Sequence, residues 1–327
     1  MKKTLAALLI VCMVGGLFAG CSAGSGNNAG SEKKAFKVGI VQLAEFVALD
    51  NATQGIRDGL KANGLIEGEN LEIDFQSAQG DQSNLSTIGD RFANEGLDLI
   101  FAVATPAAQA MASKTTTIPI LATAVTSYES ANLVQSDEVP GGNVSGTTDM
   151  NPVKEQIQLA QQMVPTAKTI GLIYNNGEAN SVLQAAIAKE EIERLGLEYT
   201  EVTVTSTNDV QQACANLVTK CDVVYLPTDN TVAASMAIVA GITQEAKIPT
   251  ICGESGMLVD GGTATLGIDY LKLGKLTGEM GAKILKEGAD ISKMSVESLT
   301  EFECVINKES VDAIGLDIPD DLKQFVS

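Results

Sequence analysis

The chain has 327 residues, of which 45% are hydrophobic and 19% are charged, so it is long enough to form two globular domains that each bury a core. Its formal net charge of −19 disfavours nucleic acid and anionic lipid surfaces as partners, because both are themselves negative. The absence of histidine removes the commonest general base and metal ligand, so an enzyme would have to use Asp, Glu, Lys, Tyr, Ser or Cys chemistry.

Residues 1–20 have the pattern of a signal peptide, and residues 21–35 that of a flexible tether rich in Gly, Ser and Asn. Lys2-Lys3 supplies a positive start, residues 5–18 are apolar, and small residues precede Cys21. This segment resembles a bacterial lipobox, which implies that Cys21 becomes the lipidated N-terminus. A transmembrane anchor is the alternative, but the apolar run is short for a bilayer span of roughly 20 residues.

From residue 36 onward, short apolar runs alternate with helical patterns. The first part has predicted strands at 37–43, 70–76, 98–103 and 118–123, with helices near 48–63, 82–95 and 105–113. After a glycine-rich stretch at 141–146, the second part has predicted strands at 168–174, 197–204, 221–226, 248–252, 263–268 and 301–306, with helices near 152–163, 179–195, 207–218, 230–246 and 270–287. This alternation predicts an α/β fold with parallel sheets, right-handed crossovers and helices on both faces.

Sequence landmarks of the first part recur in the second. Val38-Gly39-Ile40-Val41 reads like Ile170-Gly171-Leu172-Ile173, and the strand start at Asp98 reads like the one at Asp222. The repeat predicts two similar Rossmann-like lobes that present strand-end loops to a shared cleft.

Polar residues and helix starts follow nearly every predicted strand. Ligands in parallel α/β sheets bind at the carboxyl ends of the strands, so these loops are the candidate site. The candidate ligand-binding residues are Gln42, Phe46, Asp50, Thr105, Pro106, Thr126, Asn180, Ser181, Asp229, Asn230 and Glu254. Each polar residue alone is explained as a helix cap, but their recurrence after five or six strands favours a lined cleft.

The stretch from Tyr174 to Ser181 carries the most specific signal for a ligand. An apolar strand ends there and a helix begins, which leaves the first backbone N–H groups of that helix unpaired and partly positive. Such a helix start suits a carboxylate. We expect Asn180 and Ser181 to orient a ligand carboxylate and Asp229 to bind an ammonium group, so that the cleft holds a zwitterion.

Four cysteines remain beyond the tether: Cys214, Cys221, Cys252 and Cys304. No pair has the spacing of metal ligands, so no metal site is expected. Cys214 and Cys221 are plausible disulfide partners outside the cytoplasm, and buried free thiols are the equal alternative.

Several of these motifs, in this order, resemble one known family. They include Val38-Gly39-Ile40-Val41-Gln42, Ala104-Thr105-Pro106-Ala107, Asn180-Ser181, Pro227-Thr228-Asp229-Asn230 and the stretches 48–50, 205–211 and 264–270. Together they resemble the lipoprotein substrate-binding components of ABC importers in the tryptophan/tyrosine-binding-protein family. The resemblance implies a type I periplasmic-binding-protein fold with three crossovers, which we expect near residues 145–148, 268–270 and 296–300. The first lobe is then expected at 36–145 plus 269–298 and the second at 146–268 plus 299–327. It also implies a ligand trapped by hinge closure, namely an aromatic amino acid (tryptophan, tyrosine or phenylalanine).

The same resemblance sets the expected partners and location. It implies a monomer on the extracytoplasmic face of the cell membrane, held there only by its lipid anchor, that delivers its ligand to an ABC permease and its ATPase without any cofactor. One departure concerns the pocket: relatives commonly read Glu-His-Pro where this chain has Glu45-Phe46-Val47, which alters one wall contributed by the first lobe.

Competing functions lack their motifs. The first strand is not followed by the Gly-x-Gly-x-x-Gly turn of a dinucleotide-binding enzyme, and the chain has neither a P-loop nor the Gly-x-Ser-x-Gly elbow of a hydrolase. We therefore expect no catalytic residue. A binding module of the same fold that feeds a signalling receptor is the alternative, because fold alone does not decide between transport and sensing.

Overall fold

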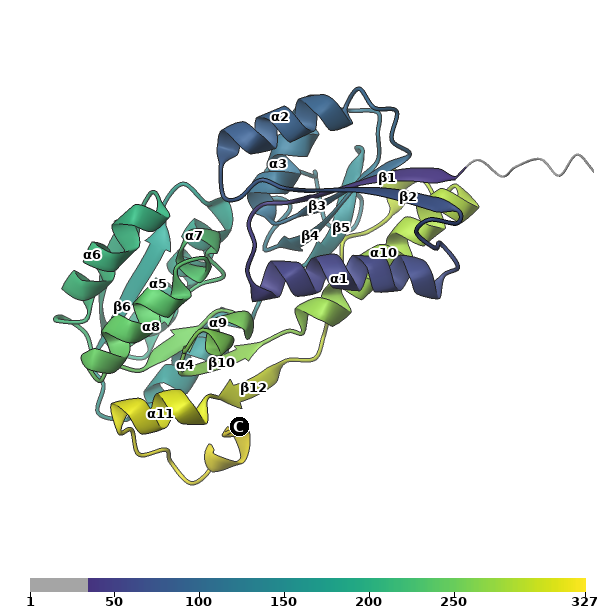
Figure 1. Ribbon diagram of the computed structural model, residues 1–327. Coiled ribbons are helices and arrows are strands. Elements are labelled where there is room, and N and C mark those ends of the chain that lie inside the picture. Colours follow the sequence, from purple (N-terminus) through teal and green to yellow (C-terminus); the bar gives the residue numbers. More distant parts are fainter. Residues whose placement is uncertain (1–34) are drawn as a thin grey trace, which may run out of the picture. The chain divides into compact units, whose positions relative to one another are not determined.

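The computed structural model describes residues 35–327, which contain two six-stranded sheets (Figure 1). The expected signal peptide, Cys21 and the tether up to residue 34 lie outside the described residues. Within the described range, no helix is both long and apolar enough to cross a membrane.

The first sheet has the strand order β11-β5-β4-β3-β1-β2, and all its strands are parallel. Its strands are β1 (Phe36–Gln42), β2 (Leu71–Ser77), β3 (Leu99–Val103), β4 (Ile120–Val125), β5 (Val144–Thr148) and β11 (Glu297–Ser298). Helices α2 (Gln82–Phe92) and α3 (Thr105–Lys114) cover one face, and α1 (Val47–Ala62) and α10 (Tyr270–Glu287) cover the other (Figure 1). Every residue of β3 and β4 is buried, as expected for parallel strands covered on both faces.

The second sheet has the order β12-β10-β9-β8-β6-β7. Its strands are β6 (Thr169–Asn175), β7 (Glu198–Val204), β8 (Val223–Leu226), β9 (Thr250–Cys252), β10 (Ala264–Gly267) and β12 (Glu303–Ile306). Its helices are α4 (Val153–Met163), α5 (Ala179–Arg194), α6 (Thr207–Leu217), α7 (Asn230–Ala233), α8 (Met236–Glu245), α9 (Gly256–Val259) and α11 (Lys308–Ile314), with short 3₁₀ turns at Ile291–Lys293 and Lys323–Phe325. Only β12 is antiparallel to its neighbour, because the chain runs directly from β11 into β12.

The two sheets have the same strand order, which confirms the predicted repeat of two α/β halves. The matching landmarks also make matching contacts. Asp98 accepts a hydrogen bond from the backbone N–H of Lys37 (2.8 Å), and Asp222 accepts one from that of Lys168 (2.8 Å). In both halves, the aspartate that opens the third strand therefore pins the start of the first strand.

The expected lobe boundary at residue 145 lies a few residues too early. Residues Val144–Thr148 form β5 of the first sheet, so the chain leaves that sheet only after Thr148. The glycine-rich stretch that ends at Gly146 had suggested a crossing between the lobes. Gly146 instead lies in a strand: a Cβ on this residue would lie 1.9 Å from the carbonyl oxygen of Ala122, so the glycine allows two strands to approach closely. We use "first half" for residues 36–148 with 270–298, and "second half" for 153–267 with 303–327.

Smaller differences concern helices. The single helix predicted at 230–246 is two helices, α7 and α8, separated at Ala234 and Ser235. The short elements β11, α9 and α11 were not predicted, since two to seven residues are too few to show a periodic pattern.

Helices α1 and α10 touch through their backbones. A Cβ on Gly55 of α1 would lie 2.2 Å from the carbonyl oxygen of Leu271, and one on Gly274 of α10 would lie 2.0 Å from that of Ala52. Four glycines, with Gly59 and Gly278 completing the set, thus make room for this packing. Helix α1 therefore packs against α10, which begins more than 200 residues later in the sequence.

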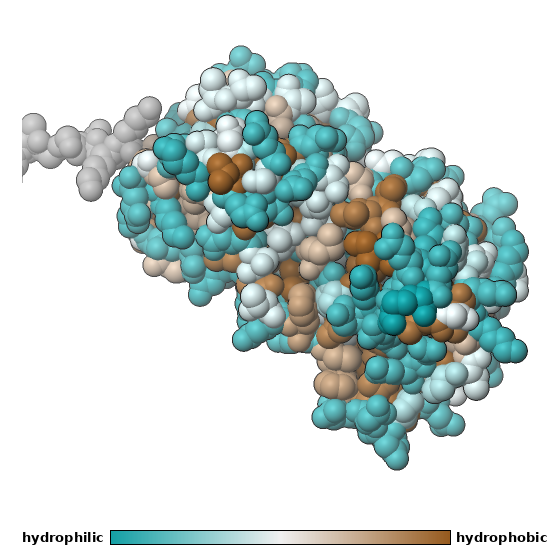
Figure 2. All heavy atoms as spheres, turned by 180° about the vertical axis from the view of Figure 1, so that it is seen from behind, coloured by the Kyte–Doolittle hydropathy of each residue, from teal (hydrophilic) through white to brown (hydrophobic). Residues whose placement is uncertain are grey.

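Few large apolar side chains of the described residues are exposed on the surface. Seen from behind, the surface is mostly hydrophilic with a few apolar patches (Figure 2). The large apolar side chains with the highest exposure include Val259 (71%) and Val139 (58%). Most of the remaining large apolar side chains pack into one core cluster in the first half and two in the second, on the two faces of its sheet.

Candidate functional site

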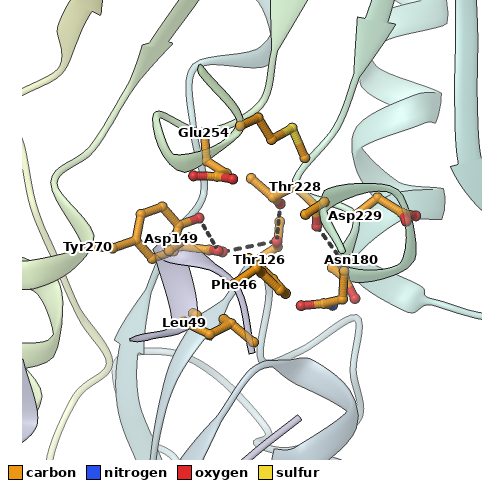
Figure 3. Close-up of a pocket in the computed structure, with 14 residues that line it drawn as sticks. Phe46, Leu49, Thr126, Asp149, Asn180, Thr228, Asp229, Glu254 and Tyr270 are labelled. Atoms are coloured by element: carbon orange, nitrogen blue, oxygen red, sulfur yellow. Dashed lines mark hydrogen bonds between the residues drawn. The ribbon is translucent and has the colours of Figure 1, made fainter. Parts of the chain in front are cut away.

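A cavity with about 300 Å³ of empty space, part of it open to solvent, lies where the two halves meet (Figure 3). It is lined by Phe46, Ala48, Leu49, Ala124, Thr126, Asp149, Asn180, Thr228, Asp229, Asn230, Ala233, Glu254, Met257 and Tyr270. Most of these residues follow the carboxyl ends of strands in one sheet or the other, where ligands of parallel sheets bind. No lysine or arginine is among these lining residues.

One end of the cavity is acidic. Asp149 (3% exposed) accepts hydrogen bonds from the hydroxyl groups of Thr126 (3.0 Å) and Tyr270 (2.7 Å). Glu254 (2% exposed) accepts one at Oε2 from the backbone N–H of Gly256, while its Oε1 is buried and has no partner among the described residues. This end therefore offers a free carboxylate oxygen to a hydrogen-bond donor.

Burial changes the protonation of both carboxyl groups. It raises the pKa of Glu254 to about 7, although the nearby backbone N–H groups of Gly256 and Met257 oppose the shift, and the charge of Asp149 adds to it. Burial also raises the pKa of Asp149, against the hydrogen bonds from Tyr270 and Thr126. A cation placed between these groups would favour their ionised forms.

The N-terminus of α1 also reaches the cavity. Phe46 is the N-cap of this helix and its side chain caps no N–H group, while Ala48 and Leu49 of the first turn line the cavity. The first intrahelical bond runs from Asp50 N to Phe46 O (3.0 Å), so the N–H groups of residues 47–49 precede the helical ladder. Such a helix start attracts an anion.

At the opposite end lie Asn180 and Asp229 (Figure 3). Asp229 already accepts two backbone hydrogen bonds, one from Asn175 N (2.6 Å) and one from Val232 N (2.8 Å), the latter as the N-cap of α7. Burial, reinforced by the nearby charge of Glu178, raises the pKa of Asp229 to about 7. Both of its oxygens thus take part in holding the loop structure.

The walls between the two ends are apolar. Phe46 and Leu49 come from the start of α1, Met257 from α9 and Ala233 from α7. Ala124 lies in an irregular stretch of β4 with φ of 54°, a left-handed conformation that is costly for alanine and frequent at functional sites. These side chains give the middle of the cavity an apolar lining.

Direct hydrogen bonds join the halves beside the cavity. Gln184 of α5 donates to the hydroxyl of Thr126 in the first half (3.0 Å) and to that of Thr228 in its own half. The two threonine hydroxyls lie 3.4 Å apart. These contacts exist only while the halves are close together.

The structure places the eleven predicted residues in two groups. Phe46, Thr126, Asn180, Asp229, Asn230 and Glu254 line the cavity, whereas Gln42, Asp50, Thr105, Pro106 and Ser181 do not. Gln42 is wholly buried and donates to Asp50 (2.6 Å) and to the carbonyl of Ala44 (2.7 Å), so it fixes the loop before α1. Pro106 instead lines a wider outer hollow of about 1010 Å³.

Sequence reasoning missed Asp149 and Tyr270. They lie in or beside the segments that connect the halves, whereas the predicted ligand-binding residues all came from loops that follow strands or from helix starts. The predicted crossing at 268–270 contained the signal for Tyr270, because any crossover between two halves must pass close to a cavity between them.

The cysteines do not form a site. Cys214, Cys221, Cys252 and Cys304 are free, and burial raises the pKa of all four thiols, which keeps them protonated and unreactive. Among residues 35–327, no cluster of three or more Cys, Asp or Glu side chains could hold a metal ion.

Two sheets of mostly parallel strands with helices on both faces are the fold of type I periplasmic-binding proteins, which solved solute-binding proteins at 12–13% identity share. The chain belongs to the ABC transporter substrate-binding protein family, whose sequence model matches residues 37–325. It is therefore a substrate-binding protein, not an enzyme, and it is extracytoplasmic.

Three relatives are informative. A tyrosine-binding protein of Clostridioides difficile (strain R20291) is 39% identical over 322 residues, which cover 96% of this chain and 93% of that protein. An ABC domain from Streptococcus pneumoniae in complex with L-Trp has a TM-score of 0.86 and 34% identity, covering 90% and 100% of the two chains. A ligand-free, open substrate-binding protein with adhesive properties from Clostridium difficile has a TM-score of 0.69 and 43% identity, covering 90% and 98%.

The comparison also bears on conformation. The match to the L-Trp complex is better than the match to the open, ligand-free protein, although the sequence identity is lower. The two halves of this chain are therefore arranged more like those of the complex. None of the comparisons supports a sensing module that feeds a signalling receptor.

Proposed function

We propose that this protein captures an amino acid with an aromatic side chain outside the cytoplasm and delivers it to the permease and ATPase of an ABC importer. The relatives named for tyrosine and solved with L-Trp support this ligand class. The observation that carries the proposal is the free, buried Oε1 of Glu254 at the acidic end of a cavity with apolar walls.

The ligand's ammonium group binds between Glu254 and Asp149. A buried carboxylate oxygen without a donor is costly, and an ammonium group supplies both the missing hydrogen bond and the opposite charge. Asp229, which the sequence had suggested for this role, already accepts two backbone hydrogen bonds. The structure favours Glu254 over Asp229 for this reason.

The ligand's carboxylate binds at the start of α1, on the N–H groups next to Ala48 and Leu49. This differs from the expected position at Asn180 and Ser181. There, the carboxylate of Glu178 accepts hydrogen bonds from Thr231 and Asn230, and a second anion beside it would be repelled. The aromatic ring then lies against Phe46 and Met257.

Hinge closure is the step that a transporter can detect. A ligand held by α1 from the first half and Glu254 from the second binds the closed arrangement better than an open one, and only that difference shifts the population. Asp149 and Tyr270 belong to the ends of two of the segments between the halves, so the ligand also contacts the hinge. The closed form is the one presented to the permease.

The direct test is to identify the ligand and to measure how much its contact with Glu254 contributes to affinity. Mass spectrometry of the purified protein should reveal a co-purified aromatic amino acid, and calorimetry should measure its affinity. Because losing one partner of a buried charged pair costs about 2–5 kcal/mol, Glu254→Gln should weaken binding by roughly 30-fold or more.

A matched control is Glu72→Gln, which removes a largely exposed carboxylate near Lys37 and should leave binding unchanged. Wild-type affinity in Glu254→Gln combined with a large loss in Asp229→Asn would move the ammonium site to Asp229. Absence of binding for tyrosine, tryptophan and phenylalanine alike would refute the ligand class.

We also propose that Cys21 is lipidated and tethers the protein to the membrane surface. The support is the lipobox-like sequence before Cys21, which lies outside the described residues. In a membrane fractionation, Cys21→Ala should move the protein to the soluble fraction. Continued sedimentation with membranes would rule out this anchor.

A further inference from the structure

Asn180 has a polar atom that the protein itself does not satisfy. Its side chain is buried (5% exposed) and lines the cavity at the end away from Glu254 and Asp149 (Figure 3). The amide nitrogen has three acceptors within reach: the carbonyl of Thr228 (2.9 Å), the hydroxyl of Ser181 (3.1 Å) and Oε2 of Glu178 (3.3 Å). The amide oxygen, Oδ1, is equally buried and has no partner among the described residues.

The orientation of this amide is fixed by its surroundings. Turning it over would bring Oδ1 against the Thr228 carbonyl and the Glu178 carboxylate, which can only accept hydrogen bonds. Glu178 cannot move aside easily, because its Oε1 accepts from the backbone N–H (3.1 Å) and the hydroxyl (2.9 Å) of Thr231. With the nitrogen held by the wall, Oδ1 is the atom of Asn180 left for a ligand.

An amide oxygen accepts hydrogen bonds and repels anions, so it cannot hold the ligand's carboxylate. The ammonium group is bound at the other end, by Glu254 and Asp149. What remains opposite Oδ1 is the far end of the ligand's side chain. A donor there, the O–H of a phenol or the N–H of an indole, would complete the hydrogen bonding of Asn180.

We therefore infer that Asn180 is a specificity-determining residue that accepts a hydrogen bond from the side chain of the bound amino acid. The site then selects aromatic side chains that carry an O–H or N–H donor, as in tyrosine and tryptophan, and discriminates against phenylalanine. A closed site that excludes water leaves Oδ1 unsatisfied when phenylalanine binds, and sites of this kind discriminate strongly. This inference rests on the proposed function.

Calorimetry on the wild-type protein gives the first test, with no mutation needed. L-Phenylalanine should bind at least about tenfold more weakly than L-tyrosine, the equivalent of one hydrogen bond. L-β-(3-benzothienyl)alanine, which has the shape of tryptophan with sulfur in place of the N–H, should likewise bind at least about tenfold more weakly than L-tryptophan. Equal affinities within both pairs would overturn the inference while leaving amino-acid capture intact.

Variants then locate the contact. In Asn180→Ala, the affinity ratios within both pairs should fall to within about threefold of one, because donor and non-donor ligands now meet the same wall. Thr231→Val is the matched control: it removes a hydroxyl that also binds Glu178 but leaves Asn180 in place, so the ratios should persist. Thermal melts by circular dichroism verify folding, and Asn180→Leu, which has a similar shape and no acceptor, replaces the alanine variant where the latter does not fold.

The other outcomes are equally informative. If Asn180→Ala weakens tyrosine, tryptophan and phenylalanine by the same factor, the residue contacts the common ammonium group or acts only structurally, and the inference is wrong. If none of the three amino acids binds the wild-type protein, the proposed function fails and this inference fails with it.

Discussion

The cavity concentrates three buried carboxyl groups, those of Asp149, Asp229 and Glu254, without a basic side chain among its lining residues. Burial raises the pKa of each, because a low-dielectric environment penalises the charged form. A zwitterionic ligand brings the positive charge that the protein does not supply. Ligand binding and ionisation of these groups are therefore linked.

The linkage predicts that affinity depends on pH. With the halves close together and no ligand between them, the pKa of Glu254 is about 7, so below pH 7 its carboxyl group is mostly protonated. An ammonium ligand stabilises the ionised form, so binding at pH 6 must release a proton and affinity should fall by up to about tenfold per pH unit below 7. Calorimetry at pH 6 in buffers of different ionisation enthalpy measures the released proton.

Two variants serve as controls for the predicted pH dependence of affinity. Glu72→Gln should reproduce the wild-type pH profile, whereas Glu254→Gln should flatten it at a lower affinity. Binding that is constant from pH 8 to pH 6, with no proton released, would show that Glu254 does not face the ammonium group.

Helices α1 and α10 pack directly against each other, and the N-terminal ends of both contribute to the cavity. Ala48 and Leu49 belong to the first turn of α1, and Tyr270 is the first residue of α10. The glycines between the two helices hold them at backbone contact. The distance between helices thus sets the relative position of the α1 N-terminus and the Tyr270 hydroxyl.

Separating these helices should harm both stability and binding. In Gly274→Ala the new Cβ would meet the backbone of Ala52, and overpacking of this kind costs about 1–3 kcal/mol of unfolding free energy. The free energy of unfolding from urea titration should fall accordingly, and ligand affinity should fall with it.

Gly241→Ala is the matched control, because it is also a mid-helix glycine but has nothing within 4 Å of the added Cβ. Since alanine has the higher helix propensity, this variant should be unchanged or more stable by up to about 1 kcal/mol. Equal stability of Gly274→Ala and wild type would mean that the helices separate without cost.

Secondary structure elements could be predicted from the sequence better than the contacts between them. Most strands and most long helices were predictable because continuous apolar runs and 3.6-residue patterns are local signals. The packing of α1 on α10 was not, since the glycines at positions 55, 59, 274 and 278 become meaningful only once the two helices are known to touch. The site shows the same division: Glu254 and Asn180 follow predicted strands and were predicted, whereas Asp149 follows β5, which was mistaken for a crossover.

Across the whole molecule, three segments connect the halves: residues 149–152, 268–269 and 299–302. The first two are bound to each other, as Asn151 accepts a hydrogen bond from Ile268 N (3.1 Å) and Asp149 accepts one from the Tyr270 hydroxyl (2.7 Å). Three adjacent connections allow bending about one axis and resist separation. Gln184 and Thr126 then meet only on closure.

We therefore expect the protein to become more compact when ligand binds. Small-angle X-ray scattering should show a smaller radius of gyration with a saturating aromatic amino acid than without it. Glu254→Gln, at the ligand concentration that saturates the wild type, should remain mostly in the ligand-free form. Tight binding with no change in scattering would show that capture does not require closure.

The position of α10 within the first half also affects how the chain is made. About 120 residues separate the end of β5 from the start of α10, so at 5–20 residues per second ribosomes need roughly 6–24 s to supply the helix that covers α1. Until then, the glycine face of α1 and the part of the first sheet that lies under α10 have no cover. The first half can therefore be completed only after most of the chain has been made, which suits a protein that is exported across a membrane.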